Sequence, residues 1–231
     1  MRPIALPLCL LLVLFTKQAF SGEAFSGEYV IGHPNSGSAL NECRIIMEQV
    51  YEAIGLPVTF KGFPARRSLA FLSAGKIDAD LCRIADTYEH YPNLIRLEPA
   101  LTEIEFSALS KNTIEPVRTI KDVQGKRIGT IRGMLAAEMV FTGNNVHFES
   151  SWRSVGQLLV DDLVDIIILP TSSIKKLMKD VRFPQNYRQA PTLYKFAMFH
   201  YVHKKHVKLV PELTAEIKKR SKLTSLTNLN L

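Results

Sequence analysis

The feature of this sequence that most constrains its fold is an alternation of short β-type runs with helical runs, repeated twice along the chain. The first round begins near Glu28 and the second begins near Thr119. Such alternation is typical of α/β proteins, in which helices cover mostly parallel sheets. A strand-like segment at Tyr194–Val202 follows the second round and indicates that the chain returns to its first half. We therefore expect two lobes, formed by residues 23–108 with 194–231 and by residues 109–193.

The expected elements follow from hydrophobic periodicity and from glycine and proline at their ends. Strands are expected at residues 28–32, 57–60, 77–82, 95–99, 105–110, 127–131, 147–149, 165–169 and 194–202. Helices are expected at residues 43–54, 64–74, 134–141, 151–163, 172–179 and 210–220, with a short helical turn at 120–125.

Residues 1–22 have the organisation of a secretory signal peptide. Arg2 supplies a positive charge, an apolar run follows at Ile4–Phe15, and small residues follow that run. The run is shorter than the roughly 20 residues of a membrane-spanning helix, so we expect a leader that is cleaved after Ser21 or Gly22, with Ala24–Ser26 as a second possible site. An uncleaved N-terminal anchor is the alternative. Cleavage predicts a periplasmic protein with no membrane span in its mature form.

The basic charge of the chain is dispersed. The full chain has a net charge of +7 at neutral pH, and loss of the leader removes Arg2 and Lys17 but no acidic residue, which leaves +5. The other basic clusters are short pairs and triplets on expected helices, as is usual for solvated helix faces. We therefore expect no nucleic-acid partner.

No common catalytic motif occurs in the sequence, which lacks the G-x-S-x-G, Walker, H-E-x-x-H and G-x-G-x-x-G patterns. His200, His203 and His206 lie close together, but no cysteine or carboxylate accompanies them at the spacing of metal ligands. We therefore expect a protein that is not an enzyme and that holds neither a cofactor nor a metal.

Three motifs occur in the order of a known family. Gly75–Asp80 resembles a G-x-hydrophobic-D-A strand, Ile120–Gly133 resembles the entry to a second lobe, and Leu158–Leu169 resembles a later L-x-x-G-x-(V/I)-D-A-hydrophobic strand. By these motifs, nearly all of the chain after the leader resembles the family 3 extracellular solute-binding proteins. The resemblance implies a periplasmic-binding-protein type II-like fold with two hinge crossings. It also implies a monomer that captures a small-molecule solute by lobe closure for an ABC-type importer.

The chain departs from the amino-acid binders of that family at two places. His90 stands where those proteins carry the arginine that grips the ligand α-carboxylate, and Gly133–Leu135 lacks their hydroxyl-bearing residues. Pro64–Arg67 and Asp78–Ile84 instead resemble a divergent subgroup of the family. We therefore expect a small polar solute that is acidic or amino-acid-like, without assigning a standard α-amino acid.

Two arginines of the first lobe are candidate ligand-binding residues. Arg83 follows an expected strand, and ligands of α/β sheets bind at such strand ends. Its guanidinium could clamp a carboxylate with two parallel hydrogen bonds, so we expect Arg83 to be the main anchor of an acidic group. The alternative is a surface ion pair with Asp86 or Glu89. Arg67, in the first turn of a helix, is expected to face the cleft while Arg66 faces solvent; the alternative is that both are solvated.

The second lobe offers further candidates. Arg132, Gly133 and Met134 precede an expected helix, whose first backbone N–H groups favour anions. Gly133 would let a ligand approach the backbone closely, although a simple strand-to-helix turn explains the same residues. Trp152, the single tryptophan of the chain, could stack on a ligand, but local packing is the more usual role of such a side chain.

The cysteines that remain after the leader are Cys43 and Cys82. In the sheet of the family that the chain resembles, the strands next to these residues are neighbours, so the resemblance implies that a disulfide could form. Two separately buried cysteines are the alternative.

Two other functions remain open at this stage. A dehydratase-like enzyme on the same fold could use acid–base residues such as Glu149 or Asp165. A ligand-binding module that docks on a membrane sensor would differ from a transport protein only in its partner. An enzyme would convert its ligand, whereas a binding protein would return it unchanged.

Overall fold

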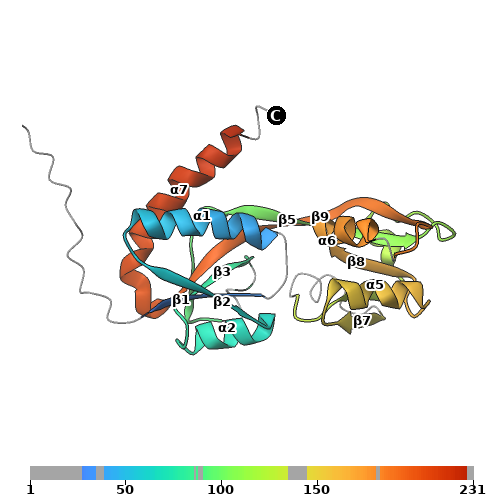
Figure 1. The fold of residues 1–231 in the computed structure, drawn as a ribbon, viewed down its shortest axis with the longest axis horizontal. Helices are drawn as coiled ribbons and strands as arrows, with labels where there is room; N and C mark the ends of the chain where they lie inside the picture. The colour runs from blue at the N-terminus through green and yellow to red at the C-terminus, as the bar shows by residue number, and fades with distance from the viewer. Residues whose placement is uncertain are drawn as a thin grey trace, which may run out of the picture.

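A computed structural model of the protein describes residues 28–34, 39–85, 87, 91–134, 145–180 and 183–227, with side chains through Arg220. The expected leader, residues 1–22, lies outside these ranges. Figure 1 shows two α/β lobes arranged end to end and joined by two long strands, β5 and β9. The two-lobed α/β fold predicted from the sequence is confirmed.

The first lobe contains a parallel sheet between helices. Its elements are β1 (Tyr29–Pro34), α1 (Ala39–Ala53), β2 (Val58–Phe63), α2 (Ala65–Ser73), β3 (Ala79–Ile84), β4 (Leu94–Arg96), η2 (Lys204–Leu209) and α7 (Val210–Thr227). β1 pairs in parallel with both β2 and β3. Tyr29 and Ile31 pack on the side of α1, whereas Val30 packs on the side of α2, so the two helices cover opposite faces.

A glycine brings α2 close to the sheet. A Cβ on Gly32 of β1 would lie 2.5 Å from both Ile77 Cδ1 and Ser68 Oγ. A larger residue would therefore push α2 away from β1. This close packing places the start of α2 beside the carboxyl ends of β1 and β3, where the candidate site lies.

The second lobe repeats the arrangement. Its elements are η1 (Ile120–Val123), β6 (Ile128–Ile131), β7 (Val146–Glu149), α5 (Trp152–Val160), β8 (Ile166–Pro170) and α6 (Thr171–Lys179). β6 pairs in parallel with β7 and β8, and every residue of β8 is buried. Val155 and Leu159 of α5 pack into the core of this lobe. The helix expected at residues 134–141 lies outside the described residues except for Met134.

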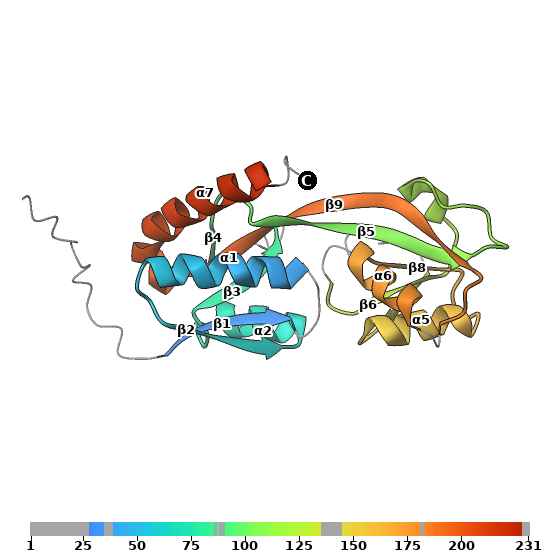
Figure 2. The ribbon, with the colours of Figure 1, turned by 45° about the horizontal axis from the view of Figure 1, so that its top comes forward.

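Two antiparallel strands connect the lobes. β5 (Thr102–Lys111) pairs with β9 (Tyr187–His203), and together they form the middle of a sheet whose order is β2-β1-β3-β9-β5-β8-β6-β7. Figure 2 shows both strands running from one lobe into the other. The register between them shifts twice, once between Phe106 and Ser107 and once between Ser107 and Leu109. The expected lobe boundaries at 108/109 and 193/194 fall inside these two strands.

β9 is longer than the strand expected at residues 194–202, because its first part pairs with β5 in the second lobe. Pro191 lies in this first part, where a proline normally argues against a strand. It falls at one of the register shifts, between the pairs Ser107–Thr192 and Leu109–Gln189. A bulge tolerates proline because the extra residue of a bulge makes no regular ladder hydrogen bond.

A disulfide fastens α1 to the sheet. Cys43 of α1 and Cys82 of β3 are both fully buried, and their Cα atoms are 6.4 Å apart. The bridge joins residues that are 39 positions apart in the sequence. It therefore fixes α1 against the strand that carries Arg83.

A buried polar network also ties α1 to the sheet. His200 Nδ1 lies 3.0 Å from the carbonyl oxygen of Leu81, which can only accept, so Nδ1 carries the proton. Nε2 then accepts from the hydroxyl of Tyr51 at 2.8 Å. Complete burial of the neutral ring lowers the pKa of His200 to about 4. The network thus joins α1, β3 and β9 through one uncharged histidine.

Removal of the disulfide is expected to destabilise the protein. The double substitution Cys43→Ala with Cys82→Ala should lower the free energy of unfolding by about 2–4 kcal/mol, since the bridge restricts the unfolded chain over a long loop. Urea unfolding of the parent, with and without reductant, and of the variant measures this. Two alkylated thiols in the denatured, unreduced parent would contradict the pairing.

Acid is expected to weaken the fold through His200. Its pKa is about 4 in the folded protein and 6.5 ordinarily, so the unfolded chain binds the extra proton between these values. The free energy of unfolding should therefore fall by roughly 3 kcal/mol on this account as the pH drops from 6.5 to 4. His200→Gln, a neutral and unprotonatable replacement, should show a flatter profile in urea unfolding at each pH. Parallel profiles for the parent and the variant would contradict this assignment.

Candidate functional site

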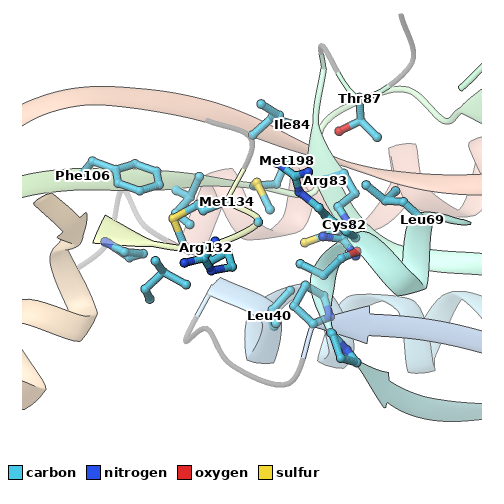
Figure 3. Close-up of a pocket in the computed structure, with 18 of the residues that line it drawn as sticks. Leu40, Leu69, Cys82, Arg83, Ile84, Thr87, Phe106, Arg132, Met134 and Met198 are labelled. Carbon is cyan, nitrogen blue, oxygen red and sulfur yellow. The ribbon is translucent and has the colours of Figure 1, made fainter. Parts of the chain in front are cut away.

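A cleft of about 460 Å³ lies between the two lobes. The first lobe lines it with the end of β3 and the start of α2, the second lobe lines it with the residues after β6, and β5 and β9 contribute residues between them. In α/β proteins, ligands bind at the carboxyl ends of parallel strands, and both lobes turn such ends to this cleft. Figure 3 shows side chains from all three parts around one space.

Arg83 enters the cleft from β3 and is held by a buried carboxylate. Its Nε donates to Asp80 Oδ1 at 2.9 Å, and its Nη2 donates to Asp80 Oδ2 at 2.8 Å. Nη2 also lies 3.3 Å from the carbonyl oxygen of Ala65. Asp80 is completely buried and accepts a further hydrogen bond from Ser68 Oγ at 2.6 Å. The guanidinium is therefore fixed in direction, and Asp80 balances its charge.

The ion pair of Asp80 with Arg83 was not predicted from the sequence. Residues three apart in a regular strand point to opposite faces, which argues against contact between Asp80 and Arg83. The pairing of β3 with β9 shifts register between these two residues. The irregularity lets both side chains lie together, as bulges do when they re-aim a side chain. The expected surface partners, Asp86 and Glu89, lie outside the described residues.

The second lobe faces Arg83 with the turn after β6. Arg132 is exposed, and its Nη2 donates to the carbonyl oxygen of Phe148 at 2.9 Å. Gly133 has a φ of +78°, a conformation that favours glycine. A Cβ added to Gly133 would lie 3.5 Å from Ala65 Cβ and 3.7 Å from Arg66 Cγ. This turn therefore touches the start of α2 across the cleft.

Apolar side chains of the hinge strands line the space between these groups. Ile104 and Phe106 of β5 and Met198 of β9 all face the cleft. The ring of Phe106 stacks on Tyr194 with ring centroids 4.9 Å apart and an interplanar angle of 16°. The ring of Phe196 meets Phe106 edge-on at 6.2 Å. Aromatic packing thus supports the apolar wall of the cleft at the point where the chain crosses between lobes.

The structure brings together four of the residues predicted to bind ligand: Arg83, Arg132, Gly133 and Met134 all line the cleft. Arg67 is exposed and is not one of the lining residues; its neighbour Arg66 lines the cleft instead, the reverse of the expected orientation.

Trp152 does not line the cleft either. The Trp152 ring packs against the core of the second lobe. The guanidinium of Arg153 stacks on this ring, 4.2 Å from the ring centroid. This arrangement matches the alternative of local packing.

The apolar lining of the cleft was not predicted from the sequence; it includes Leu40, Leu69, Ile84, Ile104, Phe106 and Met198. Apolar residues near strand ends look the same in sequence whether they face a core or a cleft, so no local signal distinguishes them. Only the pairing of β5 with β9 places residues from distant parts of the chain around one space.

The histidines of the 200–206 segment have structural partners. His206 Nε2 lies 2.7 Å from Asp78 Oδ1, which Lys205 Nζ also approaches at 2.8 Å. Within the described ranges, no three histidine, cysteine or acidic side chains gather in a way that could hold a metal ion. The same part of the chain contains no helix long and apolar enough to cross a membrane.

Removal of the Asp80 carboxylate is expected to be costly. Asp80→Ala would leave the Arg83 guanidinium, which is 9% exposed, without its counter-charge, so the free energy of unfolding should fall by about 3–5 kcal/mol. Glu103→Ala is a matched control, because Glu103 forms only an exposed pair with Lys195 at 3.9 Å. Urea unfolding of both variants measures the difference. Equal, small losses would contradict the importance of the buried pair.

No protein-family model matches the sequence. A Shewanella oneidensis protein described as uncharacterized is 24% identical over 182 residues, which cover 76% of this chain and 69% of that protein.

Several solved structures have folds similar to that of this chain. A histidine kinase sensor domain similar to periplasmic binding proteins has a TM-score of 0.71 at 13% identity and covers 88% of this chain and 94% of its own. An ancestral arginine-binding protein bound to arginine has a TM-score of 0.70 at 15% identity, covering 85% and 93%. The substrate-binding protein of an amino acid ABC transporter has a TM-score of 0.65 at 15% identity, covering 88% and 97%. The chain therefore has the two-lobed fold of periplasmic binding proteins.

Proposed function

We propose that this protein is an extracytoplasmic solute-binding protein, which captures a small polar solute, acidic or amino-acid-like, by closing its lobes. The observation that carries the proposal is the cleft itself, which both lobes line and the hinge strands bound. A rotation of one lobe against the other would change the size of this space directly. A bound solute that contacts both lobes would then favour the closed arrangement.

The hinge strands support such a motion. β5 and β9 lose regular pairing at two neighbouring points, beside Phe106 and Ser107. Domain closure needs only a few positions that absorb the change in backbone angles while the lobes move as rigid bodies. The aromatic stack of Phe106 on Tyr194 lies at the same place, so the wall of the cleft would move together with the hinge.

The residues that would bind the solute come from both lobes. Arg83 would donate hydrogen bonds from the first lobe, with its orientation set by Asp80. Arg132 and the backbone of Gly133 would act from the second lobe, and Met134 would add an apolar contact. Contacts on both sides would couple binding to closure.

An extracytoplasmic location is proposed on two grounds. Residues 1–22 have the pattern of a cleaved leader. The disulfide between Cys43 and Cys82 suits an oxidising compartment such as the periplasm.

The partner of the closed form could be an ABC permease or a membrane sensor. The likeness to the substrate-binding protein of an amino acid ABC transporter supports the first, and the likeness to a histidine kinase sensor domain supports the second. Deletion of the gene would reduce uptake of the labelled solute in the first case. In the second it would abolish the transcriptional response to the solute and leave uptake intact.

Arg83→Lys is expected to weaken solute binding by about tenfold or more, since an ammonium cannot pair with both oxygens of Asp80 and also direct a donor into the cleft as the planar guanidinium does. Lysine keeps a positive charge beside Asp80, so the fold should be retained. Arg67→Lys is the matched control, because Arg67 is exposed and does not line the cleft.

The measurement begins with a thermal-shift screen of the mature protein over polar metabolites, amino acids and organic acids among them. Calorimetric titration of both variants with the strongest hit then gives the change in affinity. X-ray scattering should show a smaller radius of gyration with the solute bound, and the solute should be recovered unchanged. Conversion of the solute would favour an enzyme, and equal affinities of the two variants would remove Arg83 from the site.

A further inference from the structure

Three arginines of the described residues, Arg66, Arg83 and Arg132, line the cleft. Arg83 and Arg132 come from opposite lobes and differ in their charge balance. Asp80, which is fully buried, compensates Arg83 through two hydrogen bonds. Arg132 forms its hydrogen bond with a neutral partner, the carbonyl oxygen of Phe148, and pairs with no carboxylate among the described residues. Arg132 therefore brings a net positive charge to the cleft, whereas Arg83 brings fixed donors with little net charge.

The surface between these two arginines is mostly apolar. Phe106 and Met198 come from the hinge strands, and Leu69 and Met134 come from the two lobes on either side. Figure 3 places Met134 near Arg132, and Leu69 on the side of Arg83. An apolar group bound there would bury hydrocarbon surface, which favours binding by about 25 cal/mol per Å² before the costs of association.

A ligand ammonium would be poorly placed in these surroundings. It would meet the positive charge of Arg132, and like charges brought together in a desolvated site repel each other strongly. The guanidinium of Arg83 offers only N–H donors, so it could not accept a hydrogen bond from the ammonium. A carboxylate would instead find donors from both lobes, and arginine binds carboxylates with two parallel hydrogen bonds.

We propose that the solute is an amphipathic organic anion, a carboxylate on a hydrocarbon chain or ring without an ammonium group. This rests on the proposed function of the cleft as a solute-binding site. Arg132 supplies the charge that attracts the carboxylate, Arg83 supplies directed hydrogen bonds, and Phe106 and Met198 contact the hydrocarbon part. Because the two arginines lie on different lobes, the carboxylate also links the lobes in the closed form.

The test uses probes that share one carbon skeleton and differ in charge. The mature, disulfide-bonded protein is titrated calorimetrically with hexanoate, norleucine, hexylamine and hexanol. Phenylpropanoate and phenylalanine form a second pair, and succinate and arginine test anions and amino acids without the apolar part. Hexanoate and phenylpropanoate are expected to bind about tenfold or more tightly than their amino-acid counterparts. Hexylamine is expected to bind least.

Two variants test the role assigned to Arg132. Arg132→Gln should weaken hexanoate binding by about tenfold or more and leave hexanol binding unchanged, because only the anion uses the charge. Arg153→Gln is the matched control, since Arg153 is an exposed arginine of the same lobe that stacks on Trp152 and does not line the cleft. It should bind hexanoate as the parent does.

The outcomes separate this proposal from the one on which it rests. Tighter binding of norleucine, phenylalanine or arginine than of the matched anions would overturn the organic anion and leave a solute-binding protein for amino acids. Binding of succinate alone would overturn the inference that the solute has an apolar part. Failure of every probe, together with a hit of another class in the thermal-shift screen, would overturn the organic anion only. Failure of both experiments would overturn the proposed function as well.

Discussion

The antiparallel pairing of β5 with β9 is the interaction on which the rest of the structure depends. One ladder joins the two lobes, supplies part of the cleft wall and contains the irregular positions where the lobes can turn. Regular strand pairing on both sides of these positions keeps each lobe rigid. A bulge bends a ladder without ending it, so the connection can be firm and deformable at once. The geometry of the candidate site follows from this pairing, because it brings distant segments to one place.

Much of the fold could be predicted because hydrophobic periodicity records the alternation of strands and helices. The length of β9 could not, since Pro191 argues against a strand unless the bulge is known. The candidate site was harder to predict from the sequence. Adjacent helical residues point in different directions, and the sequence does not say which of Arg66 and Arg67 faces the sheet's open end. The pair of Asp80 with Arg83 depends on an irregular register, which leaves no mark in the residue pattern.

The first lobe buries several polar groups and satisfies them locally. Asp80 receives hydrogen bonds from both Ser68 and Arg83, and His200 is neutral between Tyr51 and a backbone carbonyl. Burial of such groups adds little net stability, but the loss of one partner is expensive. These hydrogen bonds fix the directions of the side chains before any solute arrives, which lowers the cost of ordering the site.

The second lobe is a continuous insertion within the first. The chain leaves β5 after Lys111 and returns at Tyr187, and these two residues are direct partners across the ladder. The points of departure and return are therefore neighbours on the ladder. Genetic recombination could replace the inserted segment as a unit, carrying Arg132 and Gly133 with it. One half of the cleft could thus diversify during evolution while the other half kept its sequence.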